Sequence, residues 1–140
     1  MTNENLSSYL ETDNLRLIDA NLNRLREGLR VVEDIFRYIF NDKIIASRLK
    51  TIRHLSRLDN YKELLESRDI KNDVLKSSTT SEQSRKNLTS ILIANFKRAQ
   101  ESARVLEEFT KLHSSNESEN FKYIRYELYD IEKSITLLKI

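Results

Sequence analysis

The sequence contains no cysteine and no proline, and its one glycine is Gly28. Without cysteine the chain has neither a disulfide framework nor a thiolate zinc site. Hairpins, sandwiches and barrels need turn residues at regular intervals, and this sequence does not supply them. The same scarcity excludes the glycine-rich loops that cradle phosphates in many nucleotide-binding proteins. A chain of 140 residues with this composition is predicted to be all-α.

Neither sign of charge dominates, and long apolar runs are absent from the sequence. The 24 basic and 22 acidic residues give a net charge of +2, which argues against a non-specific nucleic-acid binder. No apolar stretch reaches the length of a membrane span. Residues 1–14 are polar and acidic, unlike a secretory signal. We therefore expect a cytoplasmic protein that binds neither nucleic acid nor a membrane.

Apolar residues recur at helical spacing in four segments, which predicts an all-α bundle of four long helices arranged as two duplicated hairpins. We expect a flexible tail at residues 1–12 and a single helical domain at 13–140. Within it, the first hairpin spans about 13–66, a loop follows at 67–81, and the second hairpin spans about 82–138.

Polar residues mark the helix ends. Asp13 or Asn14 is expected to cap the first helix, and Asn41–Asp42 to end it and cap the second, which continues to about Glu66. Thr79 or Thr80, three residues before Glu82 or Gln83, forms a capping-box pattern for the third helix.

One pattern occurs twice in the chain, 74 positions apart. Residues 20–33 read ANLNRLREGLRVVE, and residues 94–107 read ANFKRAQESARVLE. A later block, KTIRH at residues 50–54, matches KYIRY at 122–126 with an offset of 72. Two matched segments in the same order indicate an internal duplication and a pseudo-twofold arrangement of the hairpins.

The repeated pattern places polar residues at fixed helical spacing. At about 100° per residue, Asn21 points inward beside Gly28, whereas Arg24 and Glu27 lie on the rim. The second copy has Asn95, Arg98 and Glu101 at the same angles. Such rows are commonly salt-bridged helix surface. The alternative is that each hairpin contributes half of a shared polar cleft.

A second row is basic. Lys50, Arg53, His54 and Arg57 share one helical face, and Lys122, Arg125 and Tyr126 are the counterparts. This row is either solvated, or paired with Glu27 and Glu33 across the hairpin, or a clamp for phosphate.

The central loop adds Arg68, Asp69 and Asp73, and carboxylates of this kind hold Mg²⁺ when phosphate oxygens complete the shell. His54 and His113 have no His or Cys partner at ligand spacing, so no zinc site is expected.

Several blocks together resemble a known family. They are Asp19–Arg24, Arg26–Asp34, Lys50–His54, Arg68–Asp69 with Asp73–Val74, and Ala94–Glu108. In this order they look like the signature of the monofunctional hydroxymethylpyrimidine-phosphate kinases of thiamin biosynthesis, which are small helical proteins found alone or fused to the N-terminus of thiamin-phosphate synthase. The resemblance covers about residues 15–135. Leu75 stands where the family often has glycine.

The resemblance implies that ATP phosphorylates 4-amino-5-hydroxymethyl-2-methylpyrimidine phosphate to the diphosphate with Mg²⁺ as the metal. The acceptor phosphate is already anionic, so the chemistry needs cations more than a strong base. We expect the catalytic residues to be Arg24, Glu27, Arg53, His54 and Arg68. Substrate and phosphate are expected at Asn21, Lys50, Asn95, Arg98, Glu101 and Arg125, and Mg²⁺ at Asp69 and Asp73.

Other functions remain open at this point. The chain is alternatively a non-catalytic helical module that docks on a thiamin-pathway enzyme such as thiamin-phosphate synthase. A small RNA-binding bundle would use the basic row, but the near-neutral charge counts against it. A homodimer also stays open, as does the question of which copy holds ATP.

Overall fold

The computed structural model describes the backbone of residues 3–138 and the side chains of residues 13–80 and 82–135. Its elements are α1 (Asn3–Asp34), the π-helix η1 (Ile35–Ile39), α2 (Lys43–Leu55), α3 (Tyr61–Ser67), α4 (Thr80–Gln83), α5 (Leu88–Thr110) and α6 (Ser115–Leu138). Residues 3–138 contain no strand, so the predicted all-α class is confirmed. Within the same range, no helix has a long enough apolar stretch to cross a bilayer.

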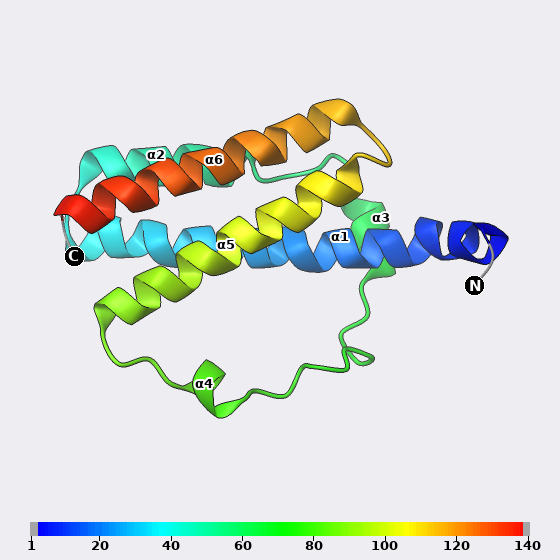
Figure 1. Cartoon of the computed structure of the whole chain (residues 1–140), viewed down its shortest axis with the longest axis horizontal. Coiled ribbons are helices and arrows are strands. Elements are labelled where there is room, and N and C mark those ends of the chain that lie inside the picture. Colours follow the sequence, from blue (N-terminus) through cyan, green and yellow to red (C-terminus); the bar gives the residue numbers. More distant parts are fainter. Residues whose placement is uncertain (1–2, 139–140) are drawn as a thin grey trace.

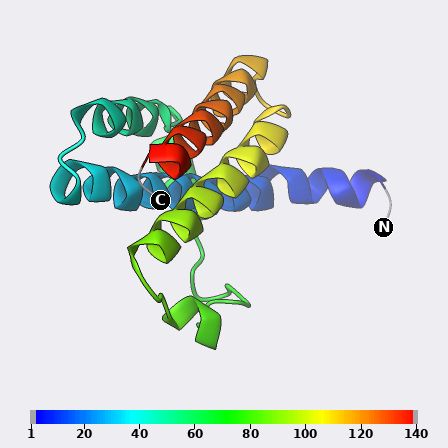
Figure 2. The ribbon, with the colours of Figure 1, turned by 60° about the vertical axis from the view of Figure 1, so that its left-hand side comes forward.

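Two helical hairpins cross each other. Figure 1 shows α2 running back along α1 and α6 running back along α5. The second hairpin lies obliquely over the first, with α5 directly on α1, and the turned view in Figure 2 shows the same crossing. α2 and α6 also touch. The predicted bundle of two hairpins is therefore confirmed.

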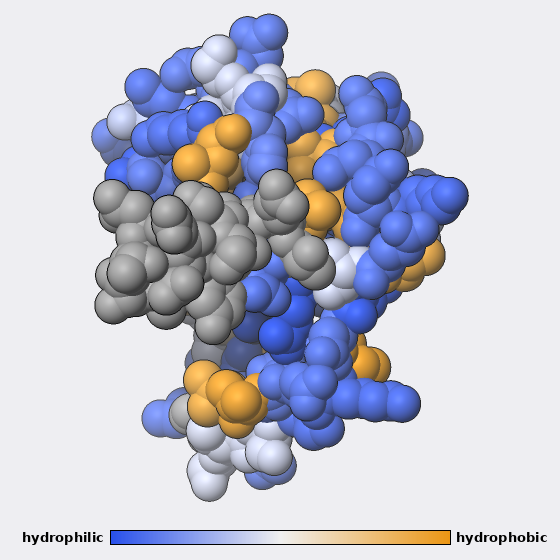
Figure 3. Space-filling view, turned by 90° about the vertical axis from the view of Figure 1, so that its right-hand side faces the viewer, coloured by the Kyte–Doolittle hydropathy of each residue, from blue (hydrophilic) through white to orange (hydrophobic). Residues whose placement is uncertain are grey.

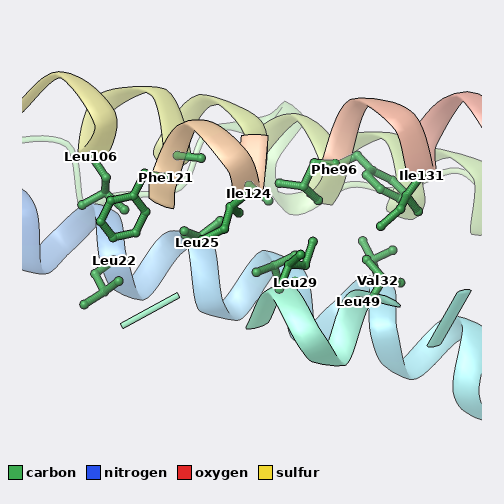
Figure 4. Close-up of a cluster of buried hydrophobic side chains, with 14 of the residues drawn as sticks. Leu22, Leu25, Leu29, Val32, Leu49, Phe96, Leu106, Phe121, Ile124 and Ile131 are labelled. Carbon is green, nitrogen blue, oxygen red and sulfur yellow. The ribbon is translucent and has the colours of Figure 1, made fainter. Parts of the chain in front are cut away.

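The hydrophobic core lies where the four long helices meet (Figure 4). Leu22, Leu25, Leu29 and Val32 of α1 face Leu49 of α2, Phe96 and Leu106 of α5, and Phe121, Ile124 and Ile131 of α6. All of these are at most 9% exposed. Burying a side chain of this size contributes roughly 1.5–3 kcal/mol. Because the apolar face of α1 is buried in this core, only its other face is available for a functional site.

α1 and α5 approach closely at Gly28. A Cβ atom at this position would lie 3.1 Å from the backbone oxygen of Asn95 and 3.5 Å from the Cβ of Ala99. Ala99 and Ala103 are fully buried on α5, and Ser102, the counterpart of Gly28, is 3% exposed. Small residues on both helices therefore let the two backbones pack against each other.

The duplication is visible in equivalent ion pairs. In the first hairpin, Arg53 on α2 donates to both carboxylate oxygens of Glu33 on α1, at 2.5 and 3.2 Å. In the second, Arg125 on α6 donates to Glu107 on α5 at 2.9 Å. Each pair joins the two helices of its own hairpin. A basic residue one turn before each carboxylate, Arg30 or Arg104, adds a longer contact of 3.9 or 3.2 Å.

The contact between α2 and α6 has the same approximate symmetry. Arg48 on α2 donates to Glu127 on α6 at 3.1 Å. Asn120, which is the counterpart of Arg48, donates to the backbone oxygen of Leu55 at 2.9 Å, and Leu55 is the counterpart of Glu127. These reciprocal contacts are those expected across a pseudo-twofold axis.

α1 begins earlier than the sequence analysis predicted. The helix starts at Asn3 rather than near Asp13, because residues 3–13 contain no glycine or proline that would interrupt it. Asn14, expected as a cap, is buried in α1 instead, and its amide nitrogen lies 2.6 Å from Nε2 of His113. Of the tail predicted at residues 1–12, residues 1 and 2 lie outside the described residues.

The turn between α1 and α2 was predicted in part. Asp42 caps α2 by accepting a hydrogen bond from the amide of Ile45, as expected. The π-helix η1, which widens the last turns before Asn41, was not predicted. Asn41 has a φ of 51°, and asparagine is one of the residues that tolerate this left-handed conformation.

The second helix was predicted to continue to residue 66, which is wrong. α2 ends at Leu55, and α3 starts at Tyr61 after an irregular segment. Ser56 ends α2, with its hydroxyl donating to the carbonyl of Ile52, and Asp59 and Asn60 follow it. Serine, aspartate and asparagine have low helix propensity, which favours an end of the helix at this place.

The third helix also starts later than predicted. The capping box of Thr79 and Glu82 forms, but it begins only the short helix α4. A second capping box, between Asn87 and Ser90, begins α5. The segment between α3 and α5 projects from the bundle, at the bottom of Figure 1, and Figure 3 shows hydrophobic surface at this end of the molecule. Val74 and Leu75 are 92% and 84% exposed there.

We predict that Gly28→Leu lowers the free energy of unfolding by roughly 2 kcal/mol or more, because the added side chain meets the backbone of α5. Ala20→Leu is the matched control, since Ala20 is exposed on the same helix. Denaturant unfolding measures both variants. An equal, small effect of the two substitutions would contradict the close crossing at Gly28.

A second prediction concerns the ion pair of Glu33 and Arg53, which are 1% and 8% exposed. Glu33→Ala leaves the Arg53 charge buried without a partner and is expected to cost ~3–5 kcal/mol of unfolding free energy. The double variant Glu33→Leu/Arg53→Met removes both charges and should recover most of this loss. Arg104→Ala, which removes an exposed member of the second cluster, should cost less than ~1 kcal/mol. If Glu33→Ala costs no more than Arg104→Ala, the pair is not structural.

Candidate functional site

An open pocket of about 450 Å³ lies between α1 and the segment after α3, and we call it the loop pocket. Its polar lining residues are Asp13, Arg16, Asp19, Asn21, Asn23, Arg24, Arg68, Asp69 and Asp73. The sequence analysis predicted Arg24, Arg68, Asp69, Asp73 and Asn21 as site residues, and the structure brings these five together. Cations and carboxylates thus share one solvent-accessible cavity.

Two arginines attach the loop to α1. Arg68 donates from Nε and Nη2 to the two carboxylate oxygens of Asp19, at 2.8 and 2.9 Å. The hydrogen bond to Asp19 raises the pKa of Arg68. Arg16 donates to the backbone oxygen of Asp69 at 2.9 Å. The start of the loop is therefore held against α1, and Arg68 is oriented by a bidentate contact.

Asp69 and Asp73, where the sequence analysis predicted Mg²⁺, both line the loop pocket. Magnesium is commonly held by one or two carboxylates together with substrate phosphates. Asp69 also accepts hydrogen bonds from the side chain and backbone of Asn72, and these lower the pKa of Asp69, so it is ionised at neutral pH. The described side chains contain no group of three or more histidine, aspartate or glutamate residues placed to hold a metal alone.

A second pocket, of about 380 Å³, adjoins the first along α1, and we call it the arginine pocket. It is lined by Asn23, Arg26, Glu27, Arg30 and Arg53. Asn23 also lines the loop pocket, so the two cavities are neighbours. The predicted residues Glu27 and Arg53 lie in this second pocket. Hydrogen bonding to Glu33 raises the pKa of Arg53 and holds its guanidinium against α1.

The rest of the predicted basic row does not join these two pockets. Lys50 lines a separate cavity of about 330 Å³ with Glu33, Arg37 and Lys43. His54 is exposed at the end of α2 and lines neither the loop pocket nor the arginine pocket. Arg53 turns toward α1 because Glu33 attracts it, which separates it from Lys50 and His54 on the same helix.

The site residues predicted in the second copy lie elsewhere. Arg98 and Glu101 are exposed on α5, and Arg125 is paired with Glu107. Neither the loop pocket nor the arginine pocket contains any residue of the second copy. Neither of these two pockets is therefore the cleft shared by both copies that the sequence analysis offered as an alternative. At Gly28 the two helices meet too closely to leave a cavity between the copies.

The two inward asparagines bond to their own helices. The side-chain nitrogen of Asn21 donates to the carbonyl of Leu17 at 3.0 Å, and that of Asn95 donates to the carbonyl of Ile91 at 2.9 Å. Each asparagine thus satisfies its amide one turn back along the helix. Asn21 also lines the loop pocket, whereas Asn95 lines neither pocket of the first copy.

Sequence reasoning missed six polar residues of the two pockets: Asp13, Arg16, Asp19, Asn23, Arg26 and Arg30. Two signals in the sequence point to some of them. Asp19, Asn23 and Arg26 lie inside the blocks that resemble the kinase family. A comparison of the two copies also singles out Asn23 and Arg26, because the second copy has Lys97 and Gln100 at the corresponding positions.

Comparison with known proteins gives long matches to part of larger chains. The chain is 38% identical over 136 residues to a thiamine-phosphate synthase of Thermosynechococcus vestitus, covering 96% of this chain and 39% of the relative. A protein of the same name from Rhodopirellula baltica is 41% identical over 128 residues, covering 88% and 34%. The chain thus spans little more than a third of the length of these curated relatives. No solved structure shows significant similarity to it.

A family model covers almost all of the part of the chain that forms the two hairpins. The matched region, residues 16–134, begins just before the first repeat and includes the arginine pocket, the loop pocket except Asp13, and α6 up to its last turn. The chain therefore belongs to the ThiD2 family.

Proposed function

We propose that the chain acts in thiamin biosynthesis by transferring the terminal phosphoryl group of ATP to 4-amino-5-hydroxymethyl-2-methylpyrimidine phosphate. The observation that carries this proposal is the gathering of Arg24, Arg68, Asp69 and Asp73 in one open pocket beside a second, arginine-lined pocket. The resemblance of the sequence blocks to the pyrimidine-phosphate kinases supplies the substrates. The name of the relatives, thiamine-phosphate synthase, supports the pathway.

The reaction needs positioned charge more than proton transfer. The bond between the γ-phosphorus of ATP and its bridging oxygen breaks, ADP leaves, and an oxygen of the acceptor phosphate forms the new bond. Negative charge is spread over the transferred group, and fixed cations stabilise it. Arg24 is exposed in the loop pocket and is the residue we assign to this task, because Arg68 is already oriented by Asp19.

Other residues bind or orient in this proposal. Asp69 and Asp73 would hold Mg²⁺, which neutralises phosphate charge when it is bound. Arg53 acts by holding the wall of the arginine pocket, since Glu33 occupies its guanidinium. Asn21 lies in the loop pocket, where its free amide oxygen would accept from the amino group of the pyrimidine.

The relatives favour a second candidate function. Their names describe thiamine-phosphate synthases and no kinase, and the region similar to this chain is only a third of each. A non-catalytic helical module that docks on thiamine-phosphate synthase would agree with these names. It would not need the pairing of cations and carboxylates in the loop pocket.

The two candidates predict different outcomes with purified protein. We expect the chain, ATP, Mg²⁺ and the pyrimidine monophosphate to yield ADP and the pyrimidine diphosphate in equal amounts. Removal of Mg²⁺ by a chelator should stop the reaction. Arg24→Ala should lower kcat/KM by roughly 10²-fold or more, because a cation is lost from the transition state.

Lys111→Ala is the control, since Lys111 is exposed directly after α5, contacts Glu108 and lines neither pocket. It should leave turnover unchanged. Absence of ADP, together with a stable complex between the chain and a thiamine-phosphate synthase, would reject the kinase and support the docking module. ADP formation that Arg24→Ala does not change would reject the assignment of Arg24.

A further inference from the structure

The two copies share an equivalent ion pair, but the residues around that pair differ. Arg53 and Arg125 are equivalent, and each is bound by the equivalent glutamate of its hairpin. Over Arg125, the rings of Tyr126 and Tyr129 lie 5.0 and 5.7 Å from the guanidinium carbon. A hydrogen bond to Tyr129 is the main cause of the raised pKa of Arg125. The second copy is therefore covered at this place, whereas the first copy has the arginine pocket.

The length of the helix explains this difference. α6 continues to Leu138, so Tyr129 and Glu132 follow Arg125 on the same helix. Glu132 accepts hydrogen bonds from Gln100 at 3.0 Å and from Lys97 at 3.4 Å. Gln100 and Lys97 are the counterparts of Arg26 and Asn23. α2 instead ends at Leu55, two residues after Arg53, so no helical turn covers the corresponding side chains.

The uncovered pocket is electropositive. Its lining has three guanidiniums, from Arg26, Arg30 and Arg53, against the single carboxylate of Glu27. Glu33 behind the pocket binds Arg53 and lies 3.9 Å from Arg30. Arg26 is different, because no ion pair within the described side chains involves it; it donates to the backbone oxygen of Ser56 at 2.9 Å. One guanidinium is thus held in place by a neutral acceptor and keeps donors for an anion.

We propose that the arginine pocket binds a phosphoryl group, with Arg26 and Arg30 as its ligands and Asn23 at its boundary with the loop pocket. This inference rests on the proposed function for the identity of the substrates. Phosphoryl transfer requires two phosphates side by side, and the two pockets share a wall at Asn23. The loop pocket, which holds Asp69 and Asp73, suits the phosphate that carries the metal, and the arginine pocket suits the other.

Arg26 has a structural role as well, because it donates to the backbone oxygen of Ser56, the residue that follows α2 at its negative end. The test must separate this role from anion binding. Arg30 provides the separation, since its side chain is 51% exposed and its nearest carboxylate, at 3.9 Å, already binds Arg53. Arg104 is its exact counterpart in the second copy and provides the matched control.

The experiment measures binding of inorganic pyrophosphate, without metal, by calorimetric titration of the full chain. We expect Arg26→Gln, which introduces the residue of the second copy, to weaken binding roughly tenfold or more, and Arg30→Gln to act in the same direction. Arg104→Gln should bind as the unaltered protein does. Thermal unfolding without pyrophosphate shows whether each variant is folded. Pyrophosphate binding that is equal in Arg26→Gln, Arg30→Gln and the unaltered protein would overturn the proposal.

Competition assigns the source of the phosphate. ATP and the pyrimidine monophosphate are each added against pyrophosphate, and the one whose competition depends on Arg26 and Arg30 is the occupant of the arginine pocket. If neither competes, the pocket does not serve the reaction and the proposal falls.

The outcome is separable from that of the proposed function. Loss of pyrophosphate binding in the variants would support the pocket even if the unaltered chain forms no ADP. Full kinase activity of Arg30→Gln would reject the pocket and leave the kinase.

Discussion

The ion pair of Glu33 and Arg53 is the interaction on which the first hairpin and its arginine pocket depend. Both side chains are almost fully buried, and two hydrogen bonds join them across α1 and α2. A buried pair of this kind contributes little to stability compared with apolar packing, but removal of one partner is costly. Its role here is to hold a guanidinium in a fixed position in the wall of the arginine pocket.

The second hairpin keeps this interaction but has lost the opening beside it. Glu107 and Arg125 preserve the pair, while Tyr129 and Glu132 cover the positions that correspond to the arginine pocket. A duplication therefore produced two halves with the same framework and different surfaces. The first half, together with the loop after α3, carries both pockets. The second half supplies the close packing partner at Gly28 and the cover of the core.

Periodicity and caps predicted the fold well, because a sequence with one glycine and no proline has few alternatives to long helices. The end of α2 at Leu55 was not predicted, because apolar residues continue beyond it at Leu58, Leu64 and Leu65. The same limit applied to the site. Charge spacing placed Arg53 on a basic face with Lys50 and His54 and offered pairing with Glu33 as one alternative, but it did not choose this pairing over a phosphate clamp. Residue spacing shows which side chains share a face of one helix, whereas their partners on neighbouring helices depend on the tertiary structure.

The nearly neutral chain is compatible with polyanionic substrates because its cations differ in how they are paired. Arg53 and Arg68 each bind a carboxylate through two hydrogen bonds, so they are rigid and largely neutralised. Arg24 and Arg26 take part in no ion pair within the described side chains, and they line the two adjoining pockets. Phosphate binding would then exchange water for fixed donors without breaking an existing ion pair, which keeps the reorganisation small. Arg53 and Arg68, which are bound to carboxylates, hold the walls of the pockets in place. Arg24 and Arg26, which have no ion pair in the described part of the chain, are the residues at which anion binding should be tested.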